Sequence, residues 1–285
     1  MSTKRPPTIQ FPSSMHSLTH GSVSSVTTHR AASPPRVMPA RRPPAASGLG
    51  FLDDDDLWAP DKLVRQLMAA TEADREWVYA GSVNIINAFR IVYGQPPLPP
   101  ERVMAEIRHY DAVPGGGSNV IVRRETWLRA GPFDARLRNT EDWEMWIRVA
   151  ALGPPAWVRS PLVARRLHRS NSSLDVDEVV RGTKLIEALH HTKADWGRMH
   201  RWMAHSSLRN RQGRAALVHF AKAAARGELA GVMSDLLGMV AERAPFLLRS
   251  ALEPSAETRD WQSEALHWLR EFQRSLTAAP GSKES

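Results

Sequence analysis

Four consecutive carboxylates directly behind a short apolar run constrain this chain more than any other feature. Phe51 and Leu52 end the run, and the acids that follow are Asp53, Asp54, Asp55 and Asp56. An apolar run entering an acid cluster predicts a strand that ends in carboxylates, and Pro60 predicts that a helix begins just after it. Adjacent like charges repel one another, so a fold tolerates them best when a cation lies among them. Strand ends of this kind commonly hold a divalent metal on a phosphate, whereas a solvated acidic turn is the alternative for an acid run alone.

The bulk composition allows a sizeable core and excludes several classes of protein. The 285 residues are enough for one large domain or two ordinary ones, and 42% of them are hydrophobic. The absence of cysteine excludes a disulfide scaffold and any thiolate metal site. The most apolar stretch, residues 229–248, is interrupted by Asp235, Glu242, Arg243 and Pro245, so we predict no membrane span.

The basic balance of the chain is concentrated in its first segment. The formal net charge is +8, and residues 1–52 contain six Lys or Arg but no Asp or Glu. The remaining residues are therefore close to neutral, which disfavours a folded nucleic-acid-binding face.

The pattern along the chain predicts three regions. Residues 1–47 are rich in Ser, Pro and Arg and show no sustained period, so we expect a disordered basic segment. Residues 48–175 alternate strand-like and helix-like runs, and residues 176–285 read as helices with a short disordered tail. We expect strands near residues 48–52, 77–83, 118–122, 156–158 and 162–167, and helices near residues 61–71, 101–109, 124–130, 141–152 and 261–276.

Three motifs follow one another in an informative order. The first is the strand with its four aspartates. The second is Gly117-Ser118-Asn119 opening a strand, followed by Gly131-Pro132-Phe133-Asp134. The third is Glu141-Asp142-Trp143 at the start of a helix that also carries Arg148. In this order the set resembles the family 2 glycosyltransferases of GT-A fold, over about residues 48–173.

The resemblance implies a role for each acidic motif. Asp55 would coordinate Mn²⁺ or Mg²⁺ on the donor diphosphate, with Asp53 and His168 as further metal contacts. Asp53, Asp54 and Asp56 would line the donor site, with Asp53 nearer the ribose. Asp142 would be the general base that deprotonates the acceptor hydroxyl, with Glu141 as the second candidate. The alternative for both is that they are ordinary acids in the first turn of a helix, where the macrodipole favours them.

The implied fold is α/β, a partial GT-A mixed sheet with flanking helices, followed by an α-helical C-terminal region. The implied reaction is metal-dependent, inverting transfer of a sugar from a nucleotide-sugar donor to a glycan, lipid-linked or protein hydroxyl acceptor. The expected location is cytoplasmic, without a membrane span, and peripheral association with the inner membrane face stays open.

One departure from the family pattern leaves alternatives open. The family's fold begins with nucleotide-binding strands that residues 1–47 do not show. The strand entering Asp53 is then expected to lack its parallel neighbours. The chain is therefore interpreted either as a truncated or misframed transferase or as a degenerate enzyme with a disordered arm. The alternative function is a catalytically dead remnant that acts as a helical binding module.

Overall fold

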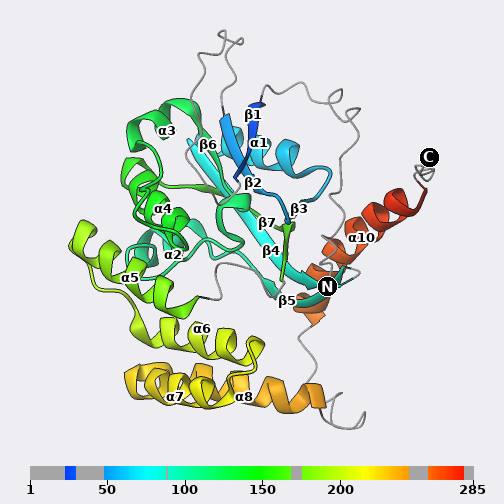
Figure 1. The fold of residues 1–285 in the computed structure, drawn as a ribbon. Helices are drawn as coiled ribbons and strands as arrows, with labels where there is room; N and C mark the ends of the chain where they lie inside the picture. Colours follow the sequence, from blue (N-terminus) through cyan, green and yellow to red (C-terminus); the bar gives the residue numbers. More distant parts are fainter. Residues whose placement is uncertain (1–22, 30–47, 88, 168–174, 244–255, 279–285) are drawn as a thin grey trace, which may run out of the picture.

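A single mixed sheet organises the molecule. The computed structural model describes residues 23–29, 48–87, 89–167, 175–243 and 256–278. Its strands run in the order β1-β2-β6-β4-β7-β3, and β5 pairs with β4 beside this path. Figure 1 shows helices on both faces of the sheet and a helical layer at one end. The strands are β1 (Val23–His29), β2 (Gly48–Asp53), β3 (Leu57–Trp58), β4 (Trp77–Ile86), β5 (Arg90–Gln95), β6 (Ile121–Arg123) and β7 (Ala156–Arg166).

Four of these strands share one direction. β1 pairs parallel with β2, and β4 pairs parallel with β7. β6 lies antiparallel between β2 and β4, so β2 and β4 also run the same way. The carboxyl ends of β1, β2, β4 and β7 therefore lie at one edge of the sheet, which is where ligands bind in open α/β folds.

The helices around the sheet begin and end within about three residues of the predicted positions, whereas α10 (Ala256–Ala278) begins five residues before its predicted start. Those around the sheet are α1 (Lys62–Glu72), α2 (Pro100–Glu106), α3 (Arg124–Ala130) and α4 (Glu141–Leu152). The C-terminal helices are α5 (Val176–His190), α6 (Trp196–Arg209), α7 (Gly213–Ala223), α8 (Leu229–Arg243) and α10 (Ala256–Ala278). Two short turns complete the set: η2 (Gly116–Asn119) and η4 (Ala224–Glu228). None of the helices in the described ranges is long and apolar enough to cross a membrane.

The side chains of β4 alternate between the two faces of the sheet and pack into a different part of the core on each face. Trp77 and Tyr79 point to the face covered by α2 and α4, and both are fully buried there. Val78 points to the other face and packs with side chains of α1. Successive side chains of a strand point to opposite faces, so a strand covered by helices on both sides is apolar throughout. β4 accordingly shows nine consecutive buried positions.

The last helix returns to the sheet. Trp268 of α10 is 6% exposed and donates a hydrogen bond from its indole nitrogen to the carbonyl oxygen of Pro161 in β7, at 3.0 Å. Trp261 lies so close to Gly81 of β4 and Gly94 of β5 that a Cβ at either glycine would collide with its ring. α10 is therefore part of the core of the sheet, whereas α6, α7 and α8 bury a separate apolar cluster of their own.

The mixed α/β fold with a helical C-terminal part is as predicted, and most differences concern single elements. The two strands expected near residues 156–158 and 162–167 are one continuous strand, β7. The strand expected at 118–122 begins as the turn η2, and β5 was not predicted.

β1 is the larger difference, because residues 1–47 were expected to be disordered. Its residues, Val23–His29, pair in parallel with the whole of β2, so β2 does have a parallel neighbour. The physical reason is local: Val and Thr favour extended backbone, and the outer edge of β2 offers unpaired peptide groups. The rest of the segment lies outside the described residues.

Replacing Trp268 with alanine tests whether α10 is part of the core. The Trp268→Ala variant should lower the free energy of unfolding by about 3 kcal/mol, because it leaves a cavity against β7 and an unpaired carbonyl at Pro161. Urea unfolding measures the change. The matched control is His267→Ala, whose side chain is 78% exposed, and it should stay within about 0.5 kcal/mol of the parent. Equal effects of the two substitutions would show that α10 is not packed on the sheet.

Candidate active site

The strand that carries the aspartates ends in a tight, well-anchored turn. The peptide N–H of Asp56 donates to the carbonyl oxygen of Asp53 at 3.2 Å, which reverses the chain. The peptide N–H of Asp53 donates to the Ser118 hydroxyl at 3.0 Å, and the Trp58 indole donates to the Ser118 carbonyl at 2.7 Å. Ser118 belongs to η2, so the glycine-rich turn of the second motif holds the acid turn of the first.

Asp56 is the buried member of the aspartate run. It is 4% exposed, and its Oδ1 accepts the peptide N–H of Arg166 at 3.1 Å. Its Oδ2 has no hydrogen-bond partner among the described residues. The pKa of Asp56 is raised to about 7, and burial is the largest cause. The charges of Asp53 and Asp55 also raise the pKa, while the charge of Arg165 and the hydrogen bond with Ser118 lower it. By contrast Asp54 is exposed and Asp55 only half-buried.

Glu141 and Asp142 open α4 as predicted, but the helix is not capped by Thr140. The Thr140 hydroxyl has no hydrogen-bond partner among the described residues, and it packs tightly against Gly182 of α5. Asp142 accepts the Trp143 peptide N–H on its own Oδ1 at 2.7 Å. Its Oδ2 lies beside Gly116, where a Cβ would approach to 3.0 Å. The second acid motif therefore also packs against the glycine-rich turn.

Burial raises the pKa values of both acids of α4. For Glu141 burial is the largest cause, the neighbouring Asp142 adds to it, and the pKa reaches about 8. Asp53 also raises the pKa of Glu141, which places the two motifs within electrostatic reach of each other. Burial likewise raises the pKa of Asp142, against the opposing hydrogen bond from Trp143 and the charge of Arg165.

Arg165, at the end of β7, is the counter-charge that the acids share. Burial alone would lower the pKa of its guanidinium, but Asp56 and Asp142 more than offset that effect and raise it. Arg165 also acts on Asp111, whose pKa burial and Asp142 raise well above the usual range. One cation therefore lies within electrostatic reach of carboxylates from three separate segments. None of the three motifs includes Arg165, and its position after the apolar strand residues 162–164 was the available signal.

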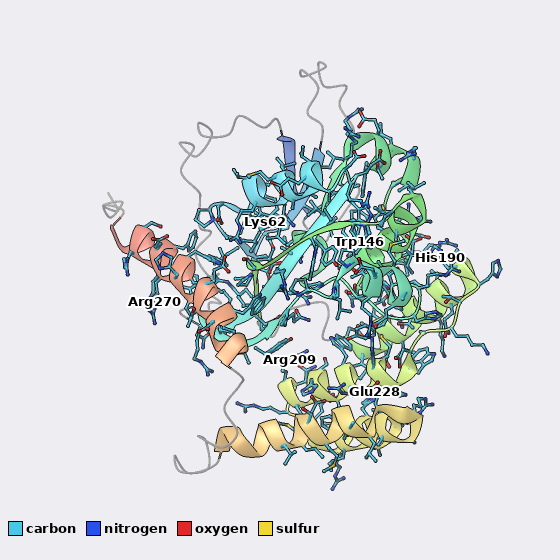
Figure 2. The ribbon with its side chains drawn as sticks, turned by 180° about the vertical axis from the view of Figure 1, so that it is seen from behind. Lys62, Trp146, His190, Arg209, Glu228 and Arg270 are labelled. Carbon is cyan, nitrogen blue, oxygen red and sulfur yellow. The ribbon has the colours of Figure 1, made fainter. Side chains whose placement is uncertain are left out.

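A second arginine reaches this region from the helical layer. Arg209 lies at the C-terminal end of α6, near the edge of the sheet where β5 runs (Figure 2). The side chain lies within electrostatic reach of Tyr93 of β5, and its Nε is buried without a partner among the described residues. Burial lowers the pKa of Arg209, and repulsion from Arg165 lowers it further. Two guanidinium groups thus lie within electrostatic range of each other at the acid site.

A buried network of side-chain amides joins η2 to β4 and α1 beside the acid turn. Asn119 of η2 donates to the carbonyl oxygens of Ala80 and Pro114, and its Oδ1 accepts the peptide N–H of Ala80 at 2.9 Å. Gln66 of α1 donates to the Asn119 carbonyl at 2.9 Å and accepts from the Lys62 ammonium at 2.7 Å. These side chains replace ladder hydrogen bonds where η2 interrupts the sheet. Ser118 and Asn119 stood in the second motif, but the sequence assigned them no role.

Other positions in and beside the motifs have structural partners. Phe51, Phe133 and Trp146, one from each motif, form an aromatic cluster with ring centroids 5.4 and 6.4 Å from Phe51. Asp134 forms an ion pair with Arg136, which lowers its pKa to about 2. Arg148 of the third motif pairs with Glu144 at 2.7 Å.

The metal ion and the contact expected from His168 both stay predictions. His168 lies outside the described residues. Within the described ranges, no three His, Asp or Glu side chains are close enough to hold a metal ion by themselves.

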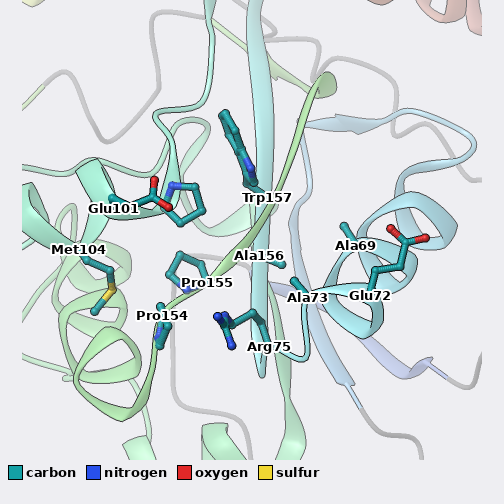
Figure 3. A pocket seen from close by; sticks show the side chains of 11 residues that line it. Ala69, Glu72, Ala73, Arg75, Glu101, Met104, Pro154, Pro155, Ala156 and Trp157 are labelled. Atoms are coloured by element: carbon teal, nitrogen blue, oxygen red, sulfur yellow. The ribbon is translucent and has the colours of Figure 1, made fainter.

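A pocket of about 660 Å³ lies away from these acids, where β7 begins, between α1 and α2 (Figure 3). It is lined by residues such as Glu72, Pro155 and Trp157 and by none of the acids discussed above.

Comparison with known proteins gives one sequence relative and several distant structures. No protein-family model matches the chain. An uncharacterized glycosyltransferase of Haemophilus influenzae is 24% identical over 133 residues, which cover 45% of this chain and 44% of the relative. The chain thus aligns with less than half the length of the curated relative that it matches. The similarity is to a glycosyltransferase, but at this identity it does not establish membership of a family.

The solved structures are more distant. S. aureus TarS 1–349 in complex with UDP-GlcNAc is 12% identical with a TM-score of 0.40, covering 84% of this chain and 70% of that one. A mannosyltransferase from Pyrobaculum calidifontis in complex with GDP-Man and Mn²⁺ is 16% identical with a TM-score of 0.34, covering 85% of this chain and 64% of that one. TM-scores below 0.5 carry no functional inference.

The raised pKa of Glu141 predicts a stability that depends on pH. The pKa of Glu141 is about 8 in the folded chain, against an ordinary value of 4.5 for a glutamate. The folded state therefore holds a proton that the unfolded state releases, and stability falls as pH rises between these values. The Glu141→Gln variant should lose less stability than the parent between pH 5 and pH 8, by about 3.5 kcal/mol, because the unfolded state is ionised over most of this range and each pH unit is then worth about 1.4 kcal/mol.

Urea unfolding at both pH values measures this difference. Glu72→Gln is the matched control, because Glu72 is an exposed acid at the end of α1. It should reproduce the pH dependence of the parent. A parent and a Glu141→Gln variant with parallel pH profiles would show that Glu141 ionises freely.

Removing the shared cation should destabilise the site in a pH-dependent way. The Arg165→Gln variant should lower the free energy of unfolding by about 3 kcal/mol at pH 8, because buried carboxylates lose their counter-charge. The loss should be smaller at pH 5, where Asp56 and its neighbours stay protonated and need no cation. Arg159→Gln on the same strand is the control, because Arg159 is exposed. A loss independent of pH would mean that Arg165 acts through packing alone.

Proposed function

We propose that this chain carries the active site of a metal-dependent glycosyltransferase, which moves a sugar from a nucleotide-sugar donor to a hydroxyl acceptor with inversion. One observation carries the proposal. The aspartate turn after β2 and the acid pair that opens α4 lie around the same arginine, at the edge where the parallel strands end. A cluster of acids with raised pKa values at this edge of an α/β sheet is typical of a catalytic site.

The aspartate turn would form the donor side. Asp53 and Asp55 would contact a Mn²⁺ or Mg²⁺ ion on the diphosphate, with Asp54 and Asp56 lining the donor site and His168 as a further candidate. The oxygen donors fit a hard cation, and the unpartnered buried Oδ2 of Asp56 offers a further acceptor. Mg²⁺ is usually held by one or two carboxylates and the phosphates of the substrate, so a cage of three protein ligands is not required. The cation would neutralise charge that develops on the leaving diphosphate.

The guanidinium groups would contribute to the same side. Arg165 lies within electrostatic reach of the acids and Arg209 within reach of Arg165, and a planar guanidinium suits phosphate oxygens. Arg165 also keeps the acids close together before any substrate binds. Its role is therefore both to hold the site in place and to favour an anionic donor.

Asp142 would act as the base on the acceptor side, with Glu141 as the second candidate. The acceptor oxygen attacks the anomeric carbon on the face opposite the diphosphate, the carbon–oxygen bond to phosphate breaks, and the base takes the hydroxyl proton. Attack from the opposite face inverts the configuration. A raised pKa makes the ionised Asp142 carboxylate a stronger base, which suits it to this task. Glu141, whose pKa is about 8, would first have to release its own proton.

Substitution of the two motifs tests the proposal. UDP-GlcNAc and GDP-mannose with Mn²⁺ or Mg²⁺ are suitable first donors, with release of nucleoside diphosphate as the readout. Asp142→Asn should lower kcat by about 10²- to 10⁴-fold, because the base is lost, while donor binding is kept. Asp55→Asn should instead abolish the metal-dependent binding of the donor.

Glu125→Gln is the control, since Glu125 is an exposed acid on α3, and it should retain the activity of the parent. Calorimetry with UDP, GDP and Mn²⁺ separates the alternative function. A folded parent that binds none of them in the presence of metal would favour a binding module without transferase activity.

A further inference from the structure

The outer surface of the α7–α8 hairpin carries a row of exposed apolar side chains. Five large ones project from it with exposed fractions of 48% to 69%: Leu217, Val218, Leu229, Met233 and Leu237. On α8 the spacing is i, i+4 and i+8, so the three side chains form one stripe along the helix. Scattered exposed leucines are ordinary, but an aligned group of this kind marks an interaction surface.

The opposite side of the same helices is already occupied. Phe220 and Ala223 of α7 and Val232 of α8 are buried against Ala204 of α6. Gly227, with φ of 94°, reverses the chain between the two helices. Figures 1 and 2 both show α7 and α8 as the outermost layer at one end of the molecule, beyond α6. The exposed row therefore points away from the rest of the fold.

Among the described side chains of the hairpin, the acidic ones face the rest of the protein and the basic ones face solvent. Its acids Glu228 and Asp235 turn inward and pair with Arg201 of α6, both at 2.9 Å. The basic residues Arg214, Lys222 and Arg226 are exposed. Arg214 and Lys222 follow the same helical spacing as Leu217 and Val218, so cations and apolar side chains share the outer face of α7. Within the described part of the hairpin, the outward charges are therefore positive.

We propose that this outer face of α7 and α8 docks on an anionic lipid surface. Amphipathic helices that lie in a membrane interface combine apolar side chains, which enter the acyl boundary, with Lys and Arg beside them. The exposed cations fit anionic headgroups, whereas the acids that would be repelled by them are already neutralised inside the protein. A protein partner with an acidic, apolar groove would need to match the same charges, and it is an outcome that the experiment distinguishes. The proposal does not depend on the transferase activity.

Vesicle flotation of the full chain tests the proposal. The parent should float with vesicles of phosphatidylcholine mixed with phosphatidylglycerol and bind pure phosphatidylcholine at least about tenfold more weakly. Added salt should weaken binding to the mixed vesicles, because it screens the headgroup charges. A parent that stays unbound with mixed vesicles at low salt overturns the proposal.

Variants on the hairpin localise the binding. The double variant Met233→Glu and Leu237→Glu should reduce binding to mixed vesicles by about tenfold or more. Lys222→Glu together with Arg226→Glu should remove the preference for the anionic lipid. Leu128→Glu is the matched control, because Leu128 is 59% exposed on α3 at the other end of the molecule, and it should bind as the parent does.

A folding and an assembly measurement complete the experiment. Far-UV circular dichroism should be unchanged in all variants, since each replaced side chain is exposed. The mass in solution without lipid should correspond to a monomer. A dimer that the Met233→Glu and Leu237→Glu changes dissociate, with no vesicle binding by the parent, would assign the face to a second copy of the chain and overturn the lipid assignment.

Discussion

The charge of Arg165 is the constraint on which the arrangement of the site depends. Buried carboxylates from separate segments repel one another, and an α/β fold can bring them to one edge only if a cation compensates them. Arg165 extends this compensation to Asp56, Asp142 and Asp111 from the end of β7. Arg165 offsets only part of the cost of burying these carboxylates, because the pKa of Asp56 still rises to about 7. A site that holds excess acid at neutral pH is prepared to bind a cation or a proton.

Below the charges, aromatic packing and one amide fix the geometry. Phe51 contacts Phe133 and Trp146, so each sequence motif contributes one ring to the same cluster. Asn119 replaces strand-to-strand hydrogen bonds next to the acid turn, and Ser118 anchors the turn itself. The residues that surround the acids in the motifs are therefore structural, and they explain why the motifs occur together. Chemistry and packing are carried by neighbouring positions of the same short segments.

One part of the helical region packs on the sheet, and another part is exposed to solvent. α10 covers the face of the sheet beside β7, and Arg209 of α6 reaches Tyr93 near the acid cluster. The α7–α8 hairpin packs only its inner side and leaves apolar and basic side chains exposed. If that face lies on a lipid surface, the acid site at the sheet edge is held at a fixed distance from it through α6. The same helices would then position the site and stabilise it.

The sequence determined the local elements and the identity of the acids. Periodicity and stop signals placed α1, α4 and β2 within a residue or two, because these depend on near neighbours in the chain. Tertiary structure decided everything that depends on distant partners. It paired β1 with β2 in a segment whose composition predicted disorder, and it returned α10 to the sheet. It also made Arg165 the common counter-charge, which no spacing in the sequence could reveal, because the carboxylates that it compensates lie up to 109 residues away along the chain, at Asp56.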